Sequence, residues 1–321
     1  MQQGKSDVLV VGELNVDLIL NEIDGFPEIG KEKLANSLTN TLGSSSAIFA
    51  SNLSSLGPQV SFLGKIGEDS FGQKVLRSLD QMNVDTNFVI QDPKLTTGVT
   101  VALNYGNERA MVTHQGAMKH LEIDDITDTH LKEAKHLHFS SFFLQPNIAK
   151  DLHILMERAK NMGLTTSFDP QWDPSEKWEI QLDKILPHVD VFLPNEAELK
   201  SLAGLTDWKS ALKEISEMAN VVVAKLGANG SAFCKDGEVK MVEPFENNHI
   251  VDAIGAGDSF NAGFISRFIL GDSVEECARF GNLAGALSTT GSGGTEAFLN
   301  RERMIKLAME EFGLNREELA L

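Results

Sequence analysis

Cysteine is scarce in this sequence: Cys234 and Cys277 are the only two among 321 residues. They lie too far apart for a CxxC metal or redox motif, and two cysteines cannot build a disulfide framework. We therefore expect two reduced, buried thiols. Positive charge is scarce as well, because 28 Lys and Arg stand against 46 Asp and Glu and leave a net charge of −18. This balance opposes nonspecific contact with nucleic acid or an anionic membrane.

Long apolar runs are also missing. No stretch approaches the roughly 18 residues that span a bilayer, and the first residues, MQQGKSD, lack the basic and then apolar pattern of a signal peptide. We expect a cytoplasmic protein that binds neither membrane nor nucleic acid. With 42% hydrophobic residues, the chain is long enough for one large domain, or for one domain with a small appendage.

Short apolar runs alternate with helical patterns along most of the chain. The run from Val8 to Val11, ending in Gly12, predicts a buried strand. Similar runs predict strands at 61–64, 137–140, 165–169, 189–193 and 221–226. Apolar residues spaced by three and four predict helices over 71–82, 148–162, 196–202 and 208–219, and an amphipathic helix over 301–321. The alternation predicts a doubly wound α/β fold, whose mostly parallel sheet has helices on both faces.

Two segments, 15–41 and 97–116, break this rhythm. They show polar alternation and turn signals at Asp24-Gly25 and Gly106-Asn107, which predict strands rather than helices. The two segments could pair into a small β-sheet lid over a substrate, or they could be ordinary edge strands and hairpins. With the lid, the main α/β domain comprises residues 1–14, 42–96 and 117–321.

A glycine-rich turn precedes a helical pattern at 251–260. The unpaired N–H groups of a helix start suit an anion, and glycines let the main chain approach a phosphate closely. Asp258 would lie beside this anion site, where a carboxylate can accept the proton of an incoming hydroxyl. Alternatively, Asp258 is an ordinary helix N-terminal carboxylate and the glycines form a tight turn.

The stretch DAIGAGDSFNAGF (252–264) closely resembles the C-terminal signature of the ribokinase-like (PfkB) carbohydrate kinase family, DTxGAGD. Further resemblances follow in the family's order: GELNVD at 12–17, Gly43 with small residues at 44–47, GKIGEDSFG at 64–72, NEAE at 195–198 and KLGANG at 225–230. They cover essentially the whole chain. The resemblance implies a ribokinase-like fold and an ATP-dependent phosphotransferase acting on a hydroxyl of a small fructose- or ribose-like sugar or a related derivative.

Site residues are implied by the same resemblance. Asp258 would be the catalytic base, and amides of Gly255, Ala256 and Gly257 would stabilise the transferred group. Residues implied to bind the sugar are Asn15, Asp17, Gly43 and Ser44. Residues implied to bind the nucleotide are Asn195, Lys225, Gly227, Gly230 and Asn282.

Metal ions are implied too. Glu198 would organise Mg²⁺ through water, and Asp252, with carbonyls near Ile254 and from the 291–294 loop, resembles a monovalent-cation site that would take K⁺. Plainer interpretations remain for most of these residues. Asn-x-Asp is common turn chemistry, Asn195 with Glu198 matches a helix N-cap with an acidic first turn, Asn282 suits helix packing, and the 291–294 loop suits a flexible connection.

The sequence departs from the family pattern at several places. Ser44 and Ile48 stand where a second glycine and a substrate-contacting asparagine are usual. The stretch 169–173, DPQWD, lacks the arginine found near DPN in many relatives, which weakens the case for a phosphorylated or carboxylated substrate. Ala253-Ile254 replaces a threonine pair, with little consequence if only carbonyls serve the cation.

Other chemistry has weaker support. His136 and His138 alternate on one predicted strand, but no further metal ligands are evident, and half-buried histidines are the plainer interpretation. Arg109 and His114 in the second lid segment could reach substrate or be solvated. The start at Gly12 is no GxGxxG fingerprint, and GxSxG, HExxH and GxxxxGK[ST] are absent.

Three functions therefore stay open. A carbohydrate kinase is favoured. A catalytically impaired sugar- or nucleoside-binding protein of the same fold is the alternative, and a nicotinamide-dependent oxidoreductase rests only on the α/β pattern. For the kinase we expect sugar and ATP as small-molecule partners, and a homodimer formed through the lid.

Overall fold

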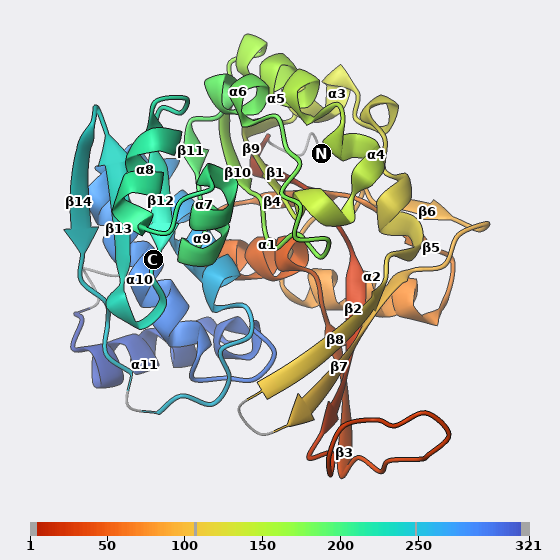
Figure 1. Cartoon of the computed structure of the whole chain (residues 1–321). Helices are drawn as coiled ribbons and strands as arrows, with labels where there is room; N and C mark the ends of the chain where they lie inside the picture. The colour runs from red at the N-terminus through yellow and green to blue at the C-terminus, as the bar shows by residue number, and fades with distance from the viewer. Residues whose placement is uncertain (1–4, 106–107, 248, 316–321) are drawn as a thin grey trace.

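The computed structural model describes residues 5–105, 108–247 and 249–315, which form a large α/β body and a smaller sheet that extends from it (Figure 1). The large sheet has the order β14 (Glu238–Val242), β13 (Ser231–Lys235), β12 (Val222–Lys225), β11 (Val191–Phe192), β10 (Thr165–Asp169), β9 (Ala134–Ser140), β1 (Ser6–Val11), β4 (Val60–Leu63). Its strands pair in parallel from β4 to β12, and β13 and β14 extend one edge with antiparallel pairing.

Helices cover both faces of this sheet. Strand β1 explains why, since Val8 and Val10 enter one apolar cluster while Leu9 and Val11 enter the other. The first face carries α1 (Ser45–Ser55), α2 (Ser70–Gln81), α9 (Ala256–Phe268), α10 (Val274–Ser288) and α11 (Arg301–Phe312). The second carries α3 (Asp128–Lys132), α4 (Pro146–Ala149), α5 (Leu152–Asn161), α6 (Leu182–Ile185), α7 (Glu196–Ala203) and α8 (Trp208–Ser216). The predicted fold class is confirmed.

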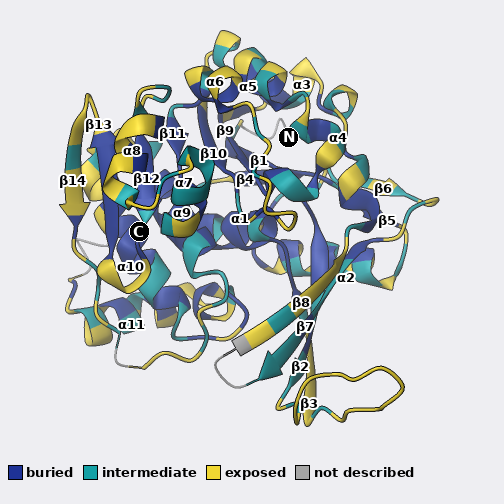
Figure 2. Cartoon of the chain, in the orientation of Figure 1, coloured by how far each residue is buried: buried dark blue, intermediate teal, exposed yellow. Residues whose placement is uncertain are grey.

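The small sheet has the order β3 (Ser37–Leu42), β2 (Asn15–Asn21), β7 (Gly98–Tyr105), β8 (Glu108–His114). It joins the two segments 15–41 and 97–116, which lack the alternation of strand and helix, because β2 pairs in parallel with β7. A further pair, β5 (Lys65–Gly67) with β6 (Ile90–Asp92), lies near its base. Burial is dense in the large sheet, whereas β3 and parts of β8 are exposed (Figure 2).

Two helix predictions need correction. The helix predicted over 148–162 is two helices, α4 and α5, because Asp151 leaves the helical conformation and stands at the N-cap of α5. The C-terminal helix ends at Phe312, where Gly313 takes a left-handed conformation, and 316–321 lie outside the described residues. The turn predicted at Gly106-Asn107 also lies outside them. Within the described parts, no helix has the length and apolar character needed to cross a membrane.

Candidate active site

The glycine turn lies at the start of α9. Gly255 is its N-cap with φ 74°, a left-handed conformation that favours glycine. A Cβ at Gly255 would come within 2.8 Å of the Gly294 Cα and 3.1 Å of Ile48. Gly294 and Ile48 therefore pack against the glycine turn. The first amides of α9, including those of Ala256 and Gly257, have no partner within the helix.

Asp258 follows this turn in the first turn of α9 and is 8% exposed. Its Oδ1 accepts a 2.9 Å hydrogen bond from Nε2 of Gln171. Burial, and then the negative charge of Asp169, raise the pKa of Asp258 to about 8, although Lys225 acts in the opposite direction. A carboxyl group with such a pKa can exchange a proton near neutral pH, which suits a general base.

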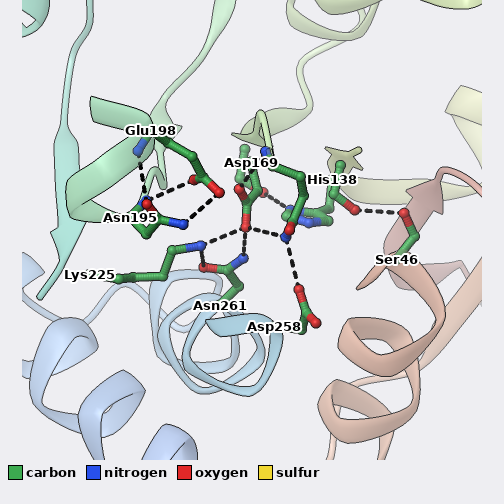
Figure 3. A network of polar contacts seen from close by, with 11 residues as sticks. Ser46, His138, Asp169, Asn195, Glu198, Lys225, Asp258 and Asn261 are labelled. Atoms are coloured by element: carbon green, nitrogen blue, oxygen red, sulfur yellow. Dashed lines mark hydrogen bonds and ion pairs between the residues drawn. The ribbon is translucent and has the colours of Figure 1, made fainter. Parts of the chain in front are cut away.

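Asp169 is the centre of the surrounding network (Figure 3). It ends β10, is fully buried, and accepts a 2.6 Å ion-pair contact from Nζ of Lys225. Asn261 and Gln171 also donate side-chain hydrogen bonds to it. Because β10 and β12 run in parallel, Asp169 and Lys225 meet at the carboxyl edge of the sheet, the usual position of a site in such folds.

Asn195 and Glu198 form a capping box at the start of α7. The Asn195 side chain accepts from the Glu198 amide at 2.9 Å, and both Glu198 oxygens accept from Asn195. The N-cap interpretation of this pair is therefore confirmed. Burial, and then the charge of Asp169, raise the pKa of Glu198 to about 7. Each Glu198 oxygen keeps a lone pair, so a water-bridged role remains open to it.

On the small sheet, a polar face carries Asn15 and Asp17. Strand register places Asp17 opposite Thr41 and Thr100, and Nδ2 of Asn15 donates to Asp17 at 2.9 Å and to Thr100 at 3.2 Å. Burial raises the pKa of Asp17 to about 6, against the hydrogen bond from Asn15.

This polar face turns toward the glycine turn. A Cβ at Gly293 would contact the Thr41 side chain at 3.4 Å, and Gly293 precedes the residue that packs on Gly255. Gly43 must be small, because its Cβ would lie 2.2 Å from Oδ1 of Asp17. The structure thus gathers the residues expected for sugar near those expected for catalysis.

The two departures from the family pattern have structural roles. Ser44, with φ 71°, caps α1 by accepting from the Ala47 amide at 2.9 Å and donates to the Glu13 carbonyl at 2.6 Å. Ile48 is 4% exposed and packs against Gly255 and Gly294. A hydroxyl thus supports the left-handed turn, and an apolar side chain fills the space under the glycine turn.

Residues expected on the nucleotide side are spread more widely. Gly227 and Gly230, both with positive φ, border the turn between β12 and β13. Nδ2 of Asn282 donates to the carbonyls of Val242 and Glu243, so this residue ties α10 to the end of β14 and serves packing. Asp252 accepts from the amides of Ile254 at 2.9 Å and Gly293 at 3.0 Å, which joins the two loops of the expected cation site.

The histidine pair on β9 has a structural explanation. His136 and His138 are fully buried rather than half-buried, and both bond Oγ of Ser167 at 2.7 Å. Across the described ranges, no three His, Cys, Asp or Glu side chains gather as a metal site. Cys234 and Cys277 are buried free thiols, as expected.

Several site residues escaped sequence analysis. The side chains that hold the network together are Glu13, Asn52, Asp169, Gln171 and Asn261. Asp169 had a usable signal, since an acidic residue at the carboxyl end of a parallel strand lies at the edge where sites form. For Asn52, which donates from α1 to Ser259 and to Gly294, no sequence signal exists.

The fold is a doubly wound α/β body with an accessory sheet, and its site combines a glycine turn at the start of α9 with the buried carboxylate of Asp258. Together they define the class of ribokinase-like phosphotransferases. The model of the pfkB family carbohydrate kinases matches residues 5–301, and the chain belongs to this family. It is therefore a carbohydrate kinase.

Known proteins resemble the chain over most of its length. It is 30% identical over 235 residues to an uncharacterized sugar kinase of Archaeoglobus fulgidus, covering 73% of this chain and 92% of that protein. It is 25% identical to the ribokinase of Haemophilus influenzae, covering 94% and 98%. The structure of Arabidopsis thaliana ribokinase complexed with ribose and ATP has a TM-score of 0.81 at 24% identity, covering 94% and 98%. Ribokinase from Thermotoga maritima also has a TM-score of 0.81, at 25% identity, covering 93% and 97%.

Proposed function

We propose that this chain is an ATP-dependent kinase that phosphorylates a hydroxyl of a small, neutral, fructose- or ribose-like sugar or a related derivative. The observation that carries the proposal is the position of Asp258, which is buried directly after the glycine turn and is joined through Gln171 to Asp169. The relatives include a ribokinase and a 2-dehydro-3-deoxygluconokinase, so the acceptor class is wide.

The reaction follows from this arrangement. The acceptor hydroxyl attacks the γ-phosphorus of ATP, its proton passes to Asp258, and the bond to the leaving ADP oxygen breaks. Amides of Gly255, Ala256 and Gly257 hold the oxygens on which charge develops. Asn15 and Asp17 orient the acceptor, because an amide donates and accepts while a carboxylate accepts from two hydroxyls. Gly43 leaves room beside them, and Ser44 supports that turn.

The nucleotide occupies the opposite side of the glycine turn in this proposal. Asn195 and Lys225 border its phosphates, and the turn between Gly227 and Gly230 lines its open side. Asn282 acts indirectly, by fixing the end of β14 that borders the adenine region. We also propose a cytoplasmic location, which the use of ATP supports.

Two cations belong to the proposal. Mg²⁺ would neutralise the ATP phosphates and would be held by those phosphates, by waters and by Glu198, a donor set that suits an ion which keeps several waters. K⁺ would lie between Asp252 and the 291–294 loop, where a carboxylate and backbone carbonyls offer only oxygen ligands. Neither cation replaces Asp258 as proton acceptor.

The small sheet acts as the lid, made of residues 15–41 and 97–116. Closing its polar face over the acceptor would exclude water and limit wasteful hydrolysis of ATP. The main domain then comprises 1–14, 42–96 and 117–321.

We further propose a homodimer through the opposite, apolar face of this sheet. Leu20 pairs with Leu38 and Leu103, and Val101 pairs with Val112. Leu38 is 61% and Val112 68% exposed, so one face of an otherwise polar appendage is apolar and uncovered.

The neutral acceptor follows from the charges. Around Asp258 lie Asp169 and Glu13, while Lys225 is already paired with Asp169. The stretch 169–173, DPQWD, contains no arginine. A phosphorylated or carboxylated sugar would add negative charge to this environment, and Arg109 on β8, which acts on Asp17, is the counterion that it would need.

The impaired binding protein is not favoured. Ser44 and Ile48 depart from the family pattern, which would favour an impaired protein, yet both fit their places and the Asp258 network is intact. The nicotinamide oxidoreductase is set aside by family membership.

A panel of neutral sugars and sugar derivatives with ATP and Mg²⁺ tests the proposal. We expect ADP and a phosphorylated product, identified by mass spectrometry, with at least one pentose- or hexose-type acceptor. Tight binding without turnover across the panel would support the impaired binding protein. Transfer only to phosphorylated sugars would contradict the neutral acceptor.

A further inference from the structure

Gln171 connects two acidic side chains of the site. Its Nε2 donates a 3.0 Å hydrogen bond to Oδ2 of Asp169 and a 2.9 Å hydrogen bond to Oδ1 of Asp258. Both partners are carboxyl groups, so the amide nitrogen with its two hydrogens, rather than the amide oxygen, faces them. Asp169 and Asp258 therefore lie on either side of one amide group (Figure 3).

The backbone at Gln171 is unusual. Its φ is 59°, a left-handed conformation that is uncommon for residues other than glycine, asparagine and aspartate. Neighbouring contacts hold it there: the Gln171 amide donates to Oδ1 of Asp169 at 3.2 Å, and the carbonyl of Pro170 accepts from the Phe142 amide at 3.2 Å. A disfavoured conformation that the surrounding contacts maintain points to a function for the side chain that it directs.

The loop after Gln171 is fixed in the same way. Asp173 is 4% exposed, and its carboxylate accepts hydrogen bonds of 2.7 to 2.9 Å from three backbone amides, those of Ser175, Lys177 and Trp178. Because the chain is anchored on both sides of Gln171, the side chain is held beside the two carboxyl groups.

The orientation of Asp258 is therefore set from the large sheet. Asp169 is fully buried at the end of β10 and is itself fixed by Lys225 and Asn261. Gln171 transmits this fixed position to Oδ1 of Asp258, because rotation of the carboxyl group about its Cβ–Cγ bond would break the 2.9 Å hydrogen bond. Oδ2 is then the oxygen that can take a proton.

Charged groups from several elements surround Asp258: Asp169 on β10, Lys225 on β12 and Glu13 after β1. Burial, and then the charges of Asp169 and Glu13, raise the pKa of Asp258 to about 8, whereas Lys225 and the hydrogen bond from Gln171 lower it. Gln171 thus favours the ionised form, which is the form that can accept a proton.

We propose that Gln171 is a positioning residue, which holds the Asp258 carboxylate with Oδ2 toward the acceptor hydroxyl and favours its ionised form. The inference rests on the proposed function. Gln171 forms and breaks no covalent bond: the acceptor proton goes to Asp258, the acceptor oxygen bonds the γ-phosphorus, and the bond to the ADP oxygen breaks. A base that is already oriented needs no rearrangement before each transfer.

The competing explanation is that Gln171 only shapes its loop. Two variants separate the explanations: Gln171→Leu removes the donors and keeps a side chain of similar size, and Gln171→Gly removes the side chain and suits the left-handed backbone. We expect kcat to fall roughly 10- to 100-fold in both, the worth of one hydrogen bond to a charged group, with acceptor KM and ATP binding nearly unchanged. A Gln171→Gly enzyme with near wild-type kcat would overturn the proposal.

The pKa of Asp258 gives a second readout that needs no acceptor. Carbon NMR spectroscopy of isotope-labelled aspartate carboxyl groups follows it, with the Asp258 signal assigned by its loss in Asp258→Asn. We expect Gln171→Leu to raise this pKa by about one unit. Gln91→Leu is the matched control that leaves the pKa unchanged, because Gln91 is exposed on β6 and pairs with Gln73.

Two further outcomes are decisive. A lower kcat in Gln171→Leu without a raised pKa of Asp258 would show an effect of the loop alone and would overturn the proposal. A wild-type enzyme that phosphorylates no acceptor would instead refute the proposed function, whatever the variants do.

Discussion

At the scale of single residues, the acidic groups of the site share one property. Asp17, Glu198 and Asp258 have pKa values raised to about 6, 7 and 8, in each case chiefly by burial. Partial protonation lowers the charge on these buried carboxyl groups near neutral pH. Only the ionised form of Asp258 can accept a proton, so its environment favours stability at low pH and activity at high pH.

The pH dependence of catalysis should show the need for an ionised Asp258. We expect kcat/KM of the free enzyme to rise about tenfold per pH unit below the pKa of Asp258, because only the ionised fraction reacts, and to level off above about 8. Initial rates between about pH 5.5 and 9.5 measure it, because this range extends below and above the pKa of Asp258. A flat profile at saturating ATP would contradict the assignment of Asp258 as base.

Stability should change in the opposite sense. The folded-state pKa of about 8 exceeds the ordinary value of 3.8, so the folded state binds the extra proton between these values. The free energy of unfolding therefore falls as pH rises from about 4 to 8. Melting temperatures measured along the same series should decline less for Asp258→Asn than for wild type. An identical decline would show that Asp258 does not titrate as described.

Asp17 is expected to act on the acceptor alone. Asp17→Ala removes a charged acceptor of hydroxyl hydrogen bonds and should raise the sugar KM roughly 10- to 100-fold, with ATP binding nearly unchanged. Asp24→Ala, in the exposed loop between β2 and β3, is the control. Equal losses of sugar and ATP affinity would show that Asp17 supports the fold instead.

At the scale of elements, the small sheet combines two chemically different faces. Period-two alternation places Asp17 and Thr100 on one face and Leu18 and Val101 on the other. An exposed apolar face of this kind is typical of an interaction surface, which is why we propose the dimer there.

The dimer predicted through this face is open to a direct test. Val112→Asp should convert a dimer to a monomer in sedimentation velocity, because a charge in an apolar interface costs several kcal/mol. Ile154→Asp, on the surface of α5, is the control for an exposed apolar residue elsewhere. A wild-type monomer at micromolar concentration with full activity would refute the dimer.

Local signals explain which elements could be predicted. Val8 to Val11 is a continuous apolar run because both faces of β1 are buried. Asn195 and Glu198 have capping-box spacing, so the start of α7 could also be located. The break between α4 and α5 was missed because apolar spacing continues across Asp151, and only its backbone conformation ends the first helix.

At the scale of the whole molecule, the parts of the site that were missed depend on contacts between distant segments. Gln171 reaches Asp258 across 87 positions, and Asn52 reaches Gly294 across 242. Neither contact has a local pattern. The glycine turn and Asp258 were found because their chemistry lies in consecutive residues, and family resemblance supplied the roles of Asn15 and Asp17.

The central claim is that Asp258 activates the acceptor in a phosphotransfer reaction. The most direct measurement is a rapid-quench single turnover with γ-labelled ATP and the best acceptor of the panel, comparing wild type, Asp258→Asn and the exposed control Asp236→Asn. We predict a transfer rate lowered roughly 10²- to 10⁴-fold in Asp258→Asn, with a folded protein, near-normal ATP binding and an unchanged control. A folded Asp258→Asn enzyme that transfers the label at nearly the wild-type rate would contradict the claim.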